Sequence, residues 1–218
     1  MKNYKLYLFD FDYTLADSSK GIVKCFQITL DKLGLPAASP ETICRTIGLP
    51  MREAVMRITQ NRSETDCDTF IDIYKQEADR YMTPLTHFYP QTISLLTALK
   101  ERGARTGIIS SKTNYRIAEK FIQDGCAHLI DHIIGSNDVQ NLKPSPEGIE
   151  AALRYFDVPK SDVLYTGDSY VDAQTAKNAG IDFAAVTTGT TSSTDFAAYP
   201  HTAILSHIGE LLTSQASC

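Results

Sequence analysis

The sequence lacks several patterns that identify whole classes of protein. No C-x-x-C pair occurs, and the cysteines are odd in number and widely spaced, which argues against a disulfide framework or a zinc site. We therefore expect reduced, mostly structural thiols in a cytoplasmic protein. No apolar run approaches the roughly 20 residues that a bilayer-spanning helix needs, so we expect no membrane segment. The cysteines are Cys25, Cys44, Cys67, Cys126 and Cys218.

The chain also lacks a basic surface. Its formal net charge is −5 and its isoelectric point about 5.5, with lysine and arginine scattered along the sequence. Because nothing supplies a basic stripe, we expect neither a nucleic-acid nor an anionic-membrane partner. Residues 1–5 lack the charged-then-apolar layout of a secretion signal, which again favours a cytoplasmic location.

Short apolar runs alternate with helix-period segments through the last two-thirds of the chain. Such alternation is typical of βαβ units, so we predict an α/β fold with a doubly wound, mostly parallel sheet. Ligands in such sheets bind beyond the carboxyl ends of the strands. The predicted strands are 105–110, 132–135, 163–166, 183–187 and 202–205, and the predicted helices are 92–102, 115–123, 146–156 and 171–179.

An all-helical stretch interrupts this alternation near the start of the chain. Apolar residues at 3-4-3 spacing from Val23 to Leu33 predict an amphipathic helix that Gly34 closes, and a long helix precedes Pro84. At 218 residues the chain has room for one domain with such an insertion. The predicted domains are an α/β core, 1–15 and 85–218, and an inserted helical cap, 16–84.

Two aspartates follow the first apolar run, 4–9. Side chains two residues apart share one face of a strand, so Asp10 and Asp12 would crowd together if the strand ran on. Like charges this close raise the cost of ionising each other unless a cation or a proton intervenes. The pair therefore indicates chemistry, although an Asp-rich turn at the end of an edge strand explains it equally well by itself.

Three further polar clusters follow predicted strands. Ser110 and Ser111 stand between a strand and a helix, where backbone N–H groups would bind an anion, although helix capping is the simpler reading of the two serines alone. Lys143 lies in a proline-fixed turn and is, by itself, an ordinary surface lysine. Asp168 and Asp172 would face the same way at the start of a helix, or would merely cap that helix.

Taken together, the clusters indicate a phosphoryl-transfer centre. The four aspartates would converge at the edge of a parallel sheet, and an all-oxygen site suits Mg²⁺. Lys143 and the Ser110 region would hold the remaining phosphate oxygens.

The motifs D-x-D-x-T, Ser, Lys and G-D-x-x-x-D, in this order, resemble the haloacid dehalogenase superfamily of phosphotransferases. The helical insertion resembles the small cap of the branch that contains phosphoglycolate phosphatase and β-phosphoglucomutase. Tyr13 departs from the pattern, because relatives commonly have glycine there. A phenol at this position could narrow the site or hydrogen-bond a substrate.

The resemblance implies a role for each motif residue. Asp10 would attack phosphorus and form an aspartyl-phosphate, and Asp12 would act as general acid and then general base. Asp12 would bind the metal through its backbone carbonyl. The implied metal ligands are Asp10, Asp12 and Asp168, with Asp172 in support, and the implied phosphate-binding residues are Thr14, Ser110, Ser111 and Lys143.

In the predicted cap, Lys20 or Arg45 could bind a substrate carboxylate or second phosphate, although a solvated cap face explains either residue taken singly. We predict a Mg²⁺-dependent, phosphoglycolate-phosphatase-like enzyme, monomeric or homodimeric, that hydrolyses a small phosphorylated metabolite. A β-phosphoglucomutase-like phosphotransferase is the enzymatic alternative. A receiver-like phospho-aspartate signalling or binding module is the alternative of another class, disfavoured because receivers are shorter and have no cap.

Overall fold

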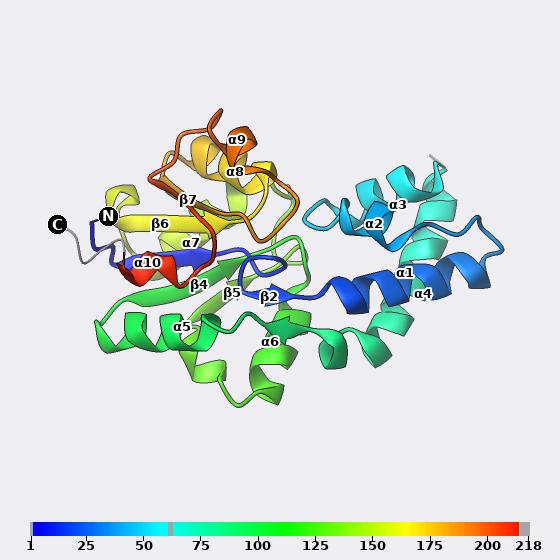
Figure 1. The fold of residues 1–218 in the computed structure, drawn as a ribbon, viewed down its shortest axis with the longest axis horizontal. Helices are drawn as coiled ribbons and strands as arrows, with labels where there is room; N and C mark the ends of the chain where they lie inside the picture. Colours follow the sequence, from blue (N-terminus) through cyan, green and yellow to red (C-terminus); the bar gives the residue numbers. More distant parts are fainter. Residues whose placement is uncertain (1, 61–62, 214–218) are drawn as a thin grey trace. The chain divides into compact units, whose positions relative to one another are not determined.

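The computed structural model describes residues 2–60 and 63–213 and divides into two compact units. The core unit contains residues 1–16 and 88–218, and the helical unit contains residues 17–87. Figure 1 shows the two chain connections between them, β2 (Ala16–Asp17) and β3 (His87–Phe88), which pair with each other. Among the described residues, no helix is both long and apolar enough to cross a membrane.

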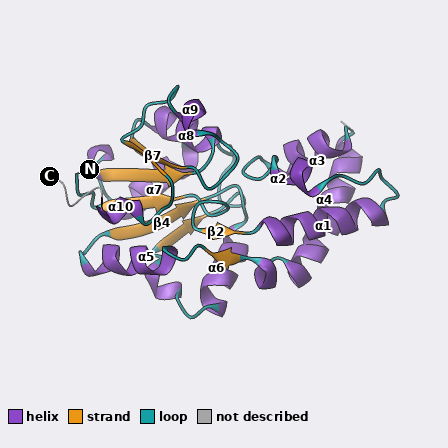
Figure 2. Ribbon diagram, in the orientation of Figure 1, coloured by secondary structure: helices purple, strands orange, loops and turns teal. Residues whose placement is uncertain are grey.

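The core unit is built on one six-stranded sheet in which every pairing is parallel. The strand order is β5-β4-β1-β6-β7-β8, with helices on both faces (Figure 2). This confirms the predicted α/β fold with a parallel sheet. The strands are β1 (Leu6–Phe9), β4 (Arg105–Ile109), β5 (His132–Ile134), β6 (Val163–Gly167), β7 (Asp182–Val186) and β8 (Ala203–Leu205).

Strand β1 is apolar throughout because both of its faces are buried. Leu6 and Leu8 point into one hydrophobic cluster, whereas Tyr7 and Phe9 point into the other. Parallel strands covered on both sides characteristically lose the polar–apolar alternation of half-exposed strands. The strand is therefore fixed in the middle of the sheet, where its carboxyl end lies between those of β4 and β6.

Each face of the sheet is covered by its own set of helices, whose apolar residues belong to the two clusters. All the predicted strands and helices listed above agree with the structure to within one residue at either end. Helices α5 (Thr92–Glu101), α6 (Asn114–Gln123), η2 (Ala127–Leu129) and α10 (Glu210–Thr213) contribute to one cluster, and α7 (Glu147–Phe156), α8 (Tyr170–Ala179) and α9 (Ser193–Phe196) to the other; η3 (Lys160–Asp162) precedes β6.

The helical unit has a hydrophobic core of its own. The ring of Phe26 lies 5.4 Å from that of Phe70 and 5.0 Å from that of Tyr74, measured between centroids. Gly34, at φ 63°, follows the first helix, as its sequence position predicts. The helices are α1 (Ser19–Lys32), α2 (Pro40–Cys44), α3 (Met51–Thr59), α4 (Glu64–Tyr81) and η1 (Thr83–Leu85).

No disulfide joins the cysteines that the structure describes. Cys25, Cys67 and Cys126 are buried, and Cys44 is partly buried. Burial among apolar side chains is what structural thiols show. Cys218 lies outside the described residues.

Candidate active site

The candidate site lies at the carboxyl end of β1, where the chain order of the sheet reverses. From β1 the sheet continues to β4 on one side and to β6 on the other. Neighbouring loops diverge at such a point and leave a crevice in which α/β proteins bind ligands. Asp10 leaves β1 there, with its backbone N–H donating to the carbonyl of Thr166 at 2.9 Å.

Asp10 is buried and incompletely bonded. Its side chain is 2% exposed, and the Lys143 ammonium lies 3.2 Å from Oδ1 as an ion pair. No residue that the structure describes gives this oxygen a well-aligned hydrogen bond. Burial, opposed by Lys143 and reinforced by Asp172 and Asp12, raises the pKa of Asp10 from 3.8 to about 6.

Asp168 follows β6 and faces Asp10. The Thr14 hydroxyl donates to its Oδ1 at 3.0 Å, so this proton is directed to Asp168 rather than to a phosphate. Burial, followed by the charges of Asp172 and Asp10, raises the pKa of Asp168 well above its usual value. Gly189 lies against the other oxygen of this carboxylate: a Cβ at this position would lie 1.9 Å from Asp168 Oδ2. Only glycine fits there without moving the carboxylate.

Asp172 differs from Asp10 and Asp168 because both of its oxygens are fully bonded. Oδ1 lies 2.6 Å from Lys143 Nζ and 2.8 Å from the Tyr165 hydroxyl. Oδ2 accepts from the backbone N–H of Ser169 at 3.1 Å and from its hydroxyl at 2.5 Å. Ser169 and Asp172 form the capping box of α8, so the helix cap is Ser169 rather than Asp168. Asp172 therefore holds the site together.

Lys143 reaches the site from the connection between β5 and α7. It is buried, and its ammonium contacts Asp10, Asp172 and, at 3.2 Å, the Tyr165 hydroxyl. Burial lowers the pKa of Lys143, but Asp10 and Asp172 outweigh it and raise the pKa above its usual value. The ammonium is therefore charged at all physiological pH values. Lys143 is accordingly a core residue rather than a surface lysine.

The carboxylates of Asp10, Asp168 and Asp172 form a group that could hold a cation. One oxygen from each lies within 4.8 Å of the others. Three buried carboxylates face one ammonium, so this centre has an excess of negative charge that a divalent cation would balance. The all-oxygen donor set fits Mg²⁺, as does Asp10 Oδ1, which accepts no well-aligned hydrogen bond from a described residue. Asp12 can add its carbonyl, to which no described backbone N–H donates.

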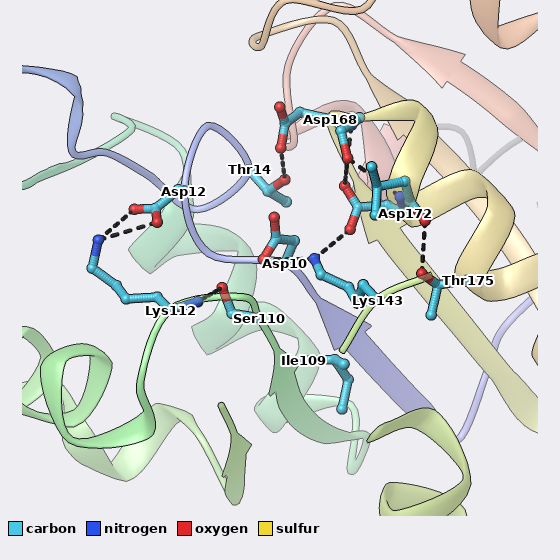
Figure 3. A network of polar contacts seen from close by, with 12 residues as sticks. Asp10, Asp12, Thr14, Ile109, Ser110, Lys112, Lys143, Asp168, Asp172 and Thr175 are labelled. Atoms are coloured by element: carbon cyan, nitrogen blue, oxygen red, sulfur yellow. Dashed lines mark hydrogen bonds and ion pairs between the residues drawn. The ribbon is translucent and has the colours of Figure 1, made fainter. Parts of the chain in front are cut away.

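Asp12 does not join the other carboxylates, contrary to the predicted cluster of four. Its two oxygens accept from the Lys112 ammonium at 2.9 and 3.1 Å. Figure 3 shows this pair to one side of the group around Asp10. The prediction was wrong because strand β1 ends at Phe9, so the two-residue periodicity of a strand no longer applies.

Ser110 lies beside this centre at the end of β4. It is 6% exposed, and its hydroxyl accepts from the backbone N–H of Lys112 at 3.3 Å. The hydrogen bond to Ser110 lowers the pKa of Asp10, which partly opposes the effect of burial. Ser111 is partly buried on the same loop. Ser110 is thus placed to donate to an anion at Asp10.

Tyr13 adopts a left-handed backbone conformation, with φ 60°. Non-glycine residues rarely adopt this conformation, and a bulky side chain is disfavoured there. Its N–H donates to Ala16 at 2.7 Å, and its carbonyl accepts from the Thr188 hydroxyl. The turn after β1 is therefore held from both sides of Tyr13.

Lys20 and Arg45 belong to the helical unit and are exposed. Arg45 forms an ion pair with Glu41 at 2.6 Å on the unit's surface. The contribution of either residue to substrate binding stays a prediction.

Sequence reasoning missed four residues of the site. Lys112 directly follows Ser110 and Ser111, and Tyr165 stands in β6 before the acidic motif. The available signal was a charged or polar side chain near the end of a predicted strand. Thr188 and Gly189 lie after β7, in a loop rich in threonine and glycine that carried no recognised motif.

The core unit is a doubly wound parallel sheet, and a buried aspartate–lysine centre lies beyond the carboxyl ends of its middle strands. Residues 7–186 match the model of the haloacid dehalogenase-like hydrolases. The chain belongs to this family of enzymes, as the motifs predict.

Named relatives span most of the chain. The pyrophosphatase PpaX of Bacillus velezensis is 27% identical over 205 residues, which cover 94% of this chain and 93% of the relative. A Listeria monocytogenes pyrophosphatase PpaX is 31% identical and covers 79% of this chain and 78% of its own length. The phosphoglycolate phosphatase of Shigella boydii is 28% identical over 202 residues, which cover 83% of this chain and 80% of the relative.

Solved structures show the same fold. A haloacid dehalogenase-like protein of Bacteroides fragilis superposes with a TM-score of 0.93 at 42% identity, covering 96% of this chain and all of the other. A haloacid dehalogenase-like hydrolase of Streptococcus pneumoniae gives a TM-score of 0.86 at 25% identity, covering 97% of this chain and 98% of the other.

Proposed function

We propose that this enzyme is a Mg²⁺-dependent phosphatase that hydrolyses a small phosphorylated metabolite through an aspartyl-phosphate on Asp10. The observation that carries the proposal is the buried Oδ1 of Asp10, which lies 3.2 Å from Lys143 Nζ but accepts no well-aligned hydrogen bond from a described residue. A buried carboxylate oxygen without a well-aligned donor costs stability, so it indicates an atom kept available for chemistry. The phosphatase names of the relatives support the same reaction class.

The nucleophile is the Asp10 carboxylate. Its pKa of about 6 in the bare protein leaves it partly protonated in mildly acidic solution, and the charge on Lys143 favours the ionised form. A bound Mg²⁺, held by Asp10, Asp168 and the Asp12 carbonyl with Asp172 in support, would neutralise charge on the carboxylates and on the phosphoryl group. Asp10 then bonds to phosphorus as the bond to the leaving oxygen breaks.

The proton is supplied by Asp12. Its carboxyl group donates to the leaving oxygen, and the resulting carboxylate later takes a proton from the water that attacks the aspartyl-phosphate. That second attack breaks the bond between phosphorus and Asp10 and releases inorganic phosphate. Asp12 lies two residues from Asp10, and its side chain is 11% exposed.

Lys143 would balance the remaining negative charge on the phosphoryl group that is transferred. Its ammonium is fixed by Asp172 and Tyr165 before any substrate binds, and such fixed donors are the most effective stabilisers of developing charge. Ser110, with support from Ser111, would donate to another phosphoryl oxygen, and Thr14 would orient Asp168.

The helical unit is proposed to act as a cap that excludes water and selects the substrate. Pyrophosphate and phosphoglycolate, which the relatives' names suggest, both have a second anionic group beyond the phosphoryl group. Lys20 or Arg45 would bind that group, and Tyr13 would narrow the pocket. We further propose a cytoplasmic enzyme that acts as a monomer or a homodimer.

The proposal is tested by phosphate release from pyrophosphate, phosphoglycolate and sugar phosphates, with Mg²⁺ or with EDTA. We expect release that requires Mg²⁺ and is abolished by Asp10→Asn. Asp182→Asn is the matched control, because Asp182 lies on β7 in the same sheet but hydrogen-bonds Tyr4 away from the site. Release that persists in Asp10→Asn would refute the nucleophile. Glucose 6-phosphate from β-glucose 1-phosphate would instead identify the mutase.

A further inference from the structure

We infer that Thr188 and Gly189, in the loop of residues 187–192 between β7 and α9, are positioning residues for the cation site. They set the direction of Asp168 and hold the turn after β1, from which Asp12 adds its carbonyl. The inference rests on the proposed function, because it requires the Mg²⁺ of that proposal. Neither residue need contact the cation to act in this way.

A closed ring of contacts joins this loop to two of the motifs. The Thr188 hydroxyl donates to the carbonyl of Tyr13. The next residue in the turn, Thr14, donates its hydroxyl to Asp168 Oδ1 at 3.0 Å, as Figure 3 shows. Asp168 lies in turn against Gly189, which is the chain neighbour of Thr188. The loop therefore fixes the turn after β1 and the acidic motif after β6 relative to each other.

Gly189 limits where the Asp168 carboxylate can lie. A Cβ at position 189 would stand 1.9 Å from Oδ2, 2.8 Å from Cγ and 3.0 Å from Cβ of Asp168. Because Cγ is also too close, rotating the carboxylate about the Cβ–Cγ bond does not remove the clash, and the whole side chain must turn about its Cα–Cβ bond. That rotation carries Oδ1 away from the Thr14 hydroxyl. A side chain at position 189 therefore displaces a proposed metal ligand.

The loop is held in place by the two residues that precede Gly189. The Thr187 N–H donates to the carbonyl of Leu205, on the edge strand β8, at 2.9 Å. The Thr187 hydroxyl donates to the same oxygen at 3.2 Å. Thr188 is bonded to the turn after β1, on the other side of β7 from β8. Because the loop is anchored in two directions, a clash at Gly189 moves Asp168 rather than the loop.

The direction of Asp168 matters most when a cation is bound. Without a cation, Asp168 faces two other buried carboxylates, so turning it away relieves repulsion and offsets the lost hydrogen bond from Thr14. With a cation bound, the same rotation removes a ligand. Residues that orient metal ligands typically contribute about 10–100-fold to metal affinity. One substitution should therefore affect the metal-bound and the metal-free protein differently.

The test measures cation affinity directly, from the free Mn²⁺ signal in electron paramagnetic resonance and from competition between Mn²⁺ and Mg²⁺. For Gly189→Ala we expect the affinity for both cations to fall by about 10–100-fold. Urea unfolding in EDTA should change little, whereas unfolding in Mg²⁺ should lose most of the stabilisation that the cation gives the wild-type enzyme. Equal losses of stability in EDTA and in Mg²⁺ would overturn the inference, because Gly189 would then serve the fold alone.

Substitutions of Thr188 test the other half of the ring, and they do so even if Gly189→Ala does not fold. Thr188→Val removes the hydroxyl but keeps the branched shape, and cation affinity should fall by about tenfold. Thr188→Ser keeps the hydroxyl and should retain most of the affinity. Thr187→Val is the matched control, because it removes a hydroxyl of the same loop that donates to Leu205 instead. It should leave cation affinity unchanged.

Wild-type cation affinity in Gly189→Ala would refute the role of Gly189, and the same result in Thr188→Val would refute that of Thr188. A loss in Thr187→Val as large as that in Thr188→Val would also overturn the inference, since any change in the loop would then disturb the site. Failure of the proposed function gives a different result. In that case the wild-type enzyme itself would bind neither cation, or would release phosphate without one.

Discussion

Asp10 and Asp172 are both buried carboxylates in contact with the same ammonium, yet their surroundings differ completely. Every lone pair direction of Asp172 is occupied by Lys143, Tyr165 or Ser169, whereas Asp10 Oδ1 has no aligned hydrogen-bond donor among the described residues. Burial of a charge is tolerable when it is fully bonded and costly when it is not. The comparison separates a carboxylate that stabilises the site from one that the site keeps available for reaction.

The largest expected effect is that of Asp10→Asn. Removal of the nucleophile should lower phosphate release by a factor of about 10⁴ or more, as for other catalytic nucleophiles. Because the same change removes one of three buried carboxylates that face a single ammonium, the variant without Mg²⁺ should be more stable than wild type by about 1–2 kcal/mol. Urea unfolding in EDTA measures this difference, and a less stable variant would contradict the contrast with Asp172.

Asp172→Ala should act in the opposite direction on stability. It removes the nearer carboxylate of the buried Lys143 ammonium and one of the two acceptors of the Tyr165 hydroxyl, so we expect a loss of about 3–5 kcal/mol. Asp195→Ala is the control, because Asp195 completes an equivalent capping box at α9 but is exposed and, among the described residues, forms no ion pair with a lysine. Its loss should be about 1 kcal/mol or less. Similar losses in the two variants would show that the helix cap, not Lys143, is the role of Asp172.

The free energy of unfolding without Mg²⁺ should depend on pH through Asp10. Its folded pKa of about 6 exceeds the usual 3.8, so the folded state binds the proton more tightly than the unfolded state. This contribution to stability is complete below pH 3.8 and is lost as pH rises through 6, on the order of 3 kcal/mol in all. Subtracting the pH profile of Asp10→Asn isolates it from other groups.

Mg²⁺ should remove most of the stability loss that Asp10 causes as pH rises, because the cation stabilises the ionised Asp10 carboxylate that the site without metal disfavours. The increase in melting temperature on adding Mg²⁺ should therefore be larger at pH 7.5 than at pH 5, and smaller in Asp10→Asn at both. An increase that does not vary with pH would contradict a metal site that includes Asp10.

The smallest effect concerns the turn between Asp10 and Asp12. Tyr13→Gly relieves a left-handed backbone that costs a non-glycine residue about 1–2 kcal/mol, but it also increases the entropy of the unfolded chain. The net expectation is a gain of about 0.5 kcal/mol in urea unfolding. A change in the order of preferred substrates would show that the phenol also contacts the substrate. A loss of stability would show that packing of the phenol outweighs the strain.

Much of this structure is predictable because local patterns and the global fold agree. The apolar run of β1 and the helical spacings specify their elements, and parallel topology brings Asp10, Lys143 and Asp168 to one edge. The direction of Asp12 could not be predicted, because it depends on where β1 ends and on the tertiary position of Lys112. The close approach of Gly189 to Asp168 likewise joins segments distant in sequence.

The central claim is that Asp10 carries the phosphoryl group, and trapping that intermediate tests it most directly. A single turnover with Mg²⁺ and p-nitrophenyl phosphate is quenched in acid, reduced with borohydride and analysed by peptide mass spectrometry. Borohydride converts a phosphorylated aspartate to homoserine, so the account predicts homoserine at position 10 and at no other aspartate. Homoserine at another position, or full phosphate release with no reducible intermediate at any time point, would contradict it.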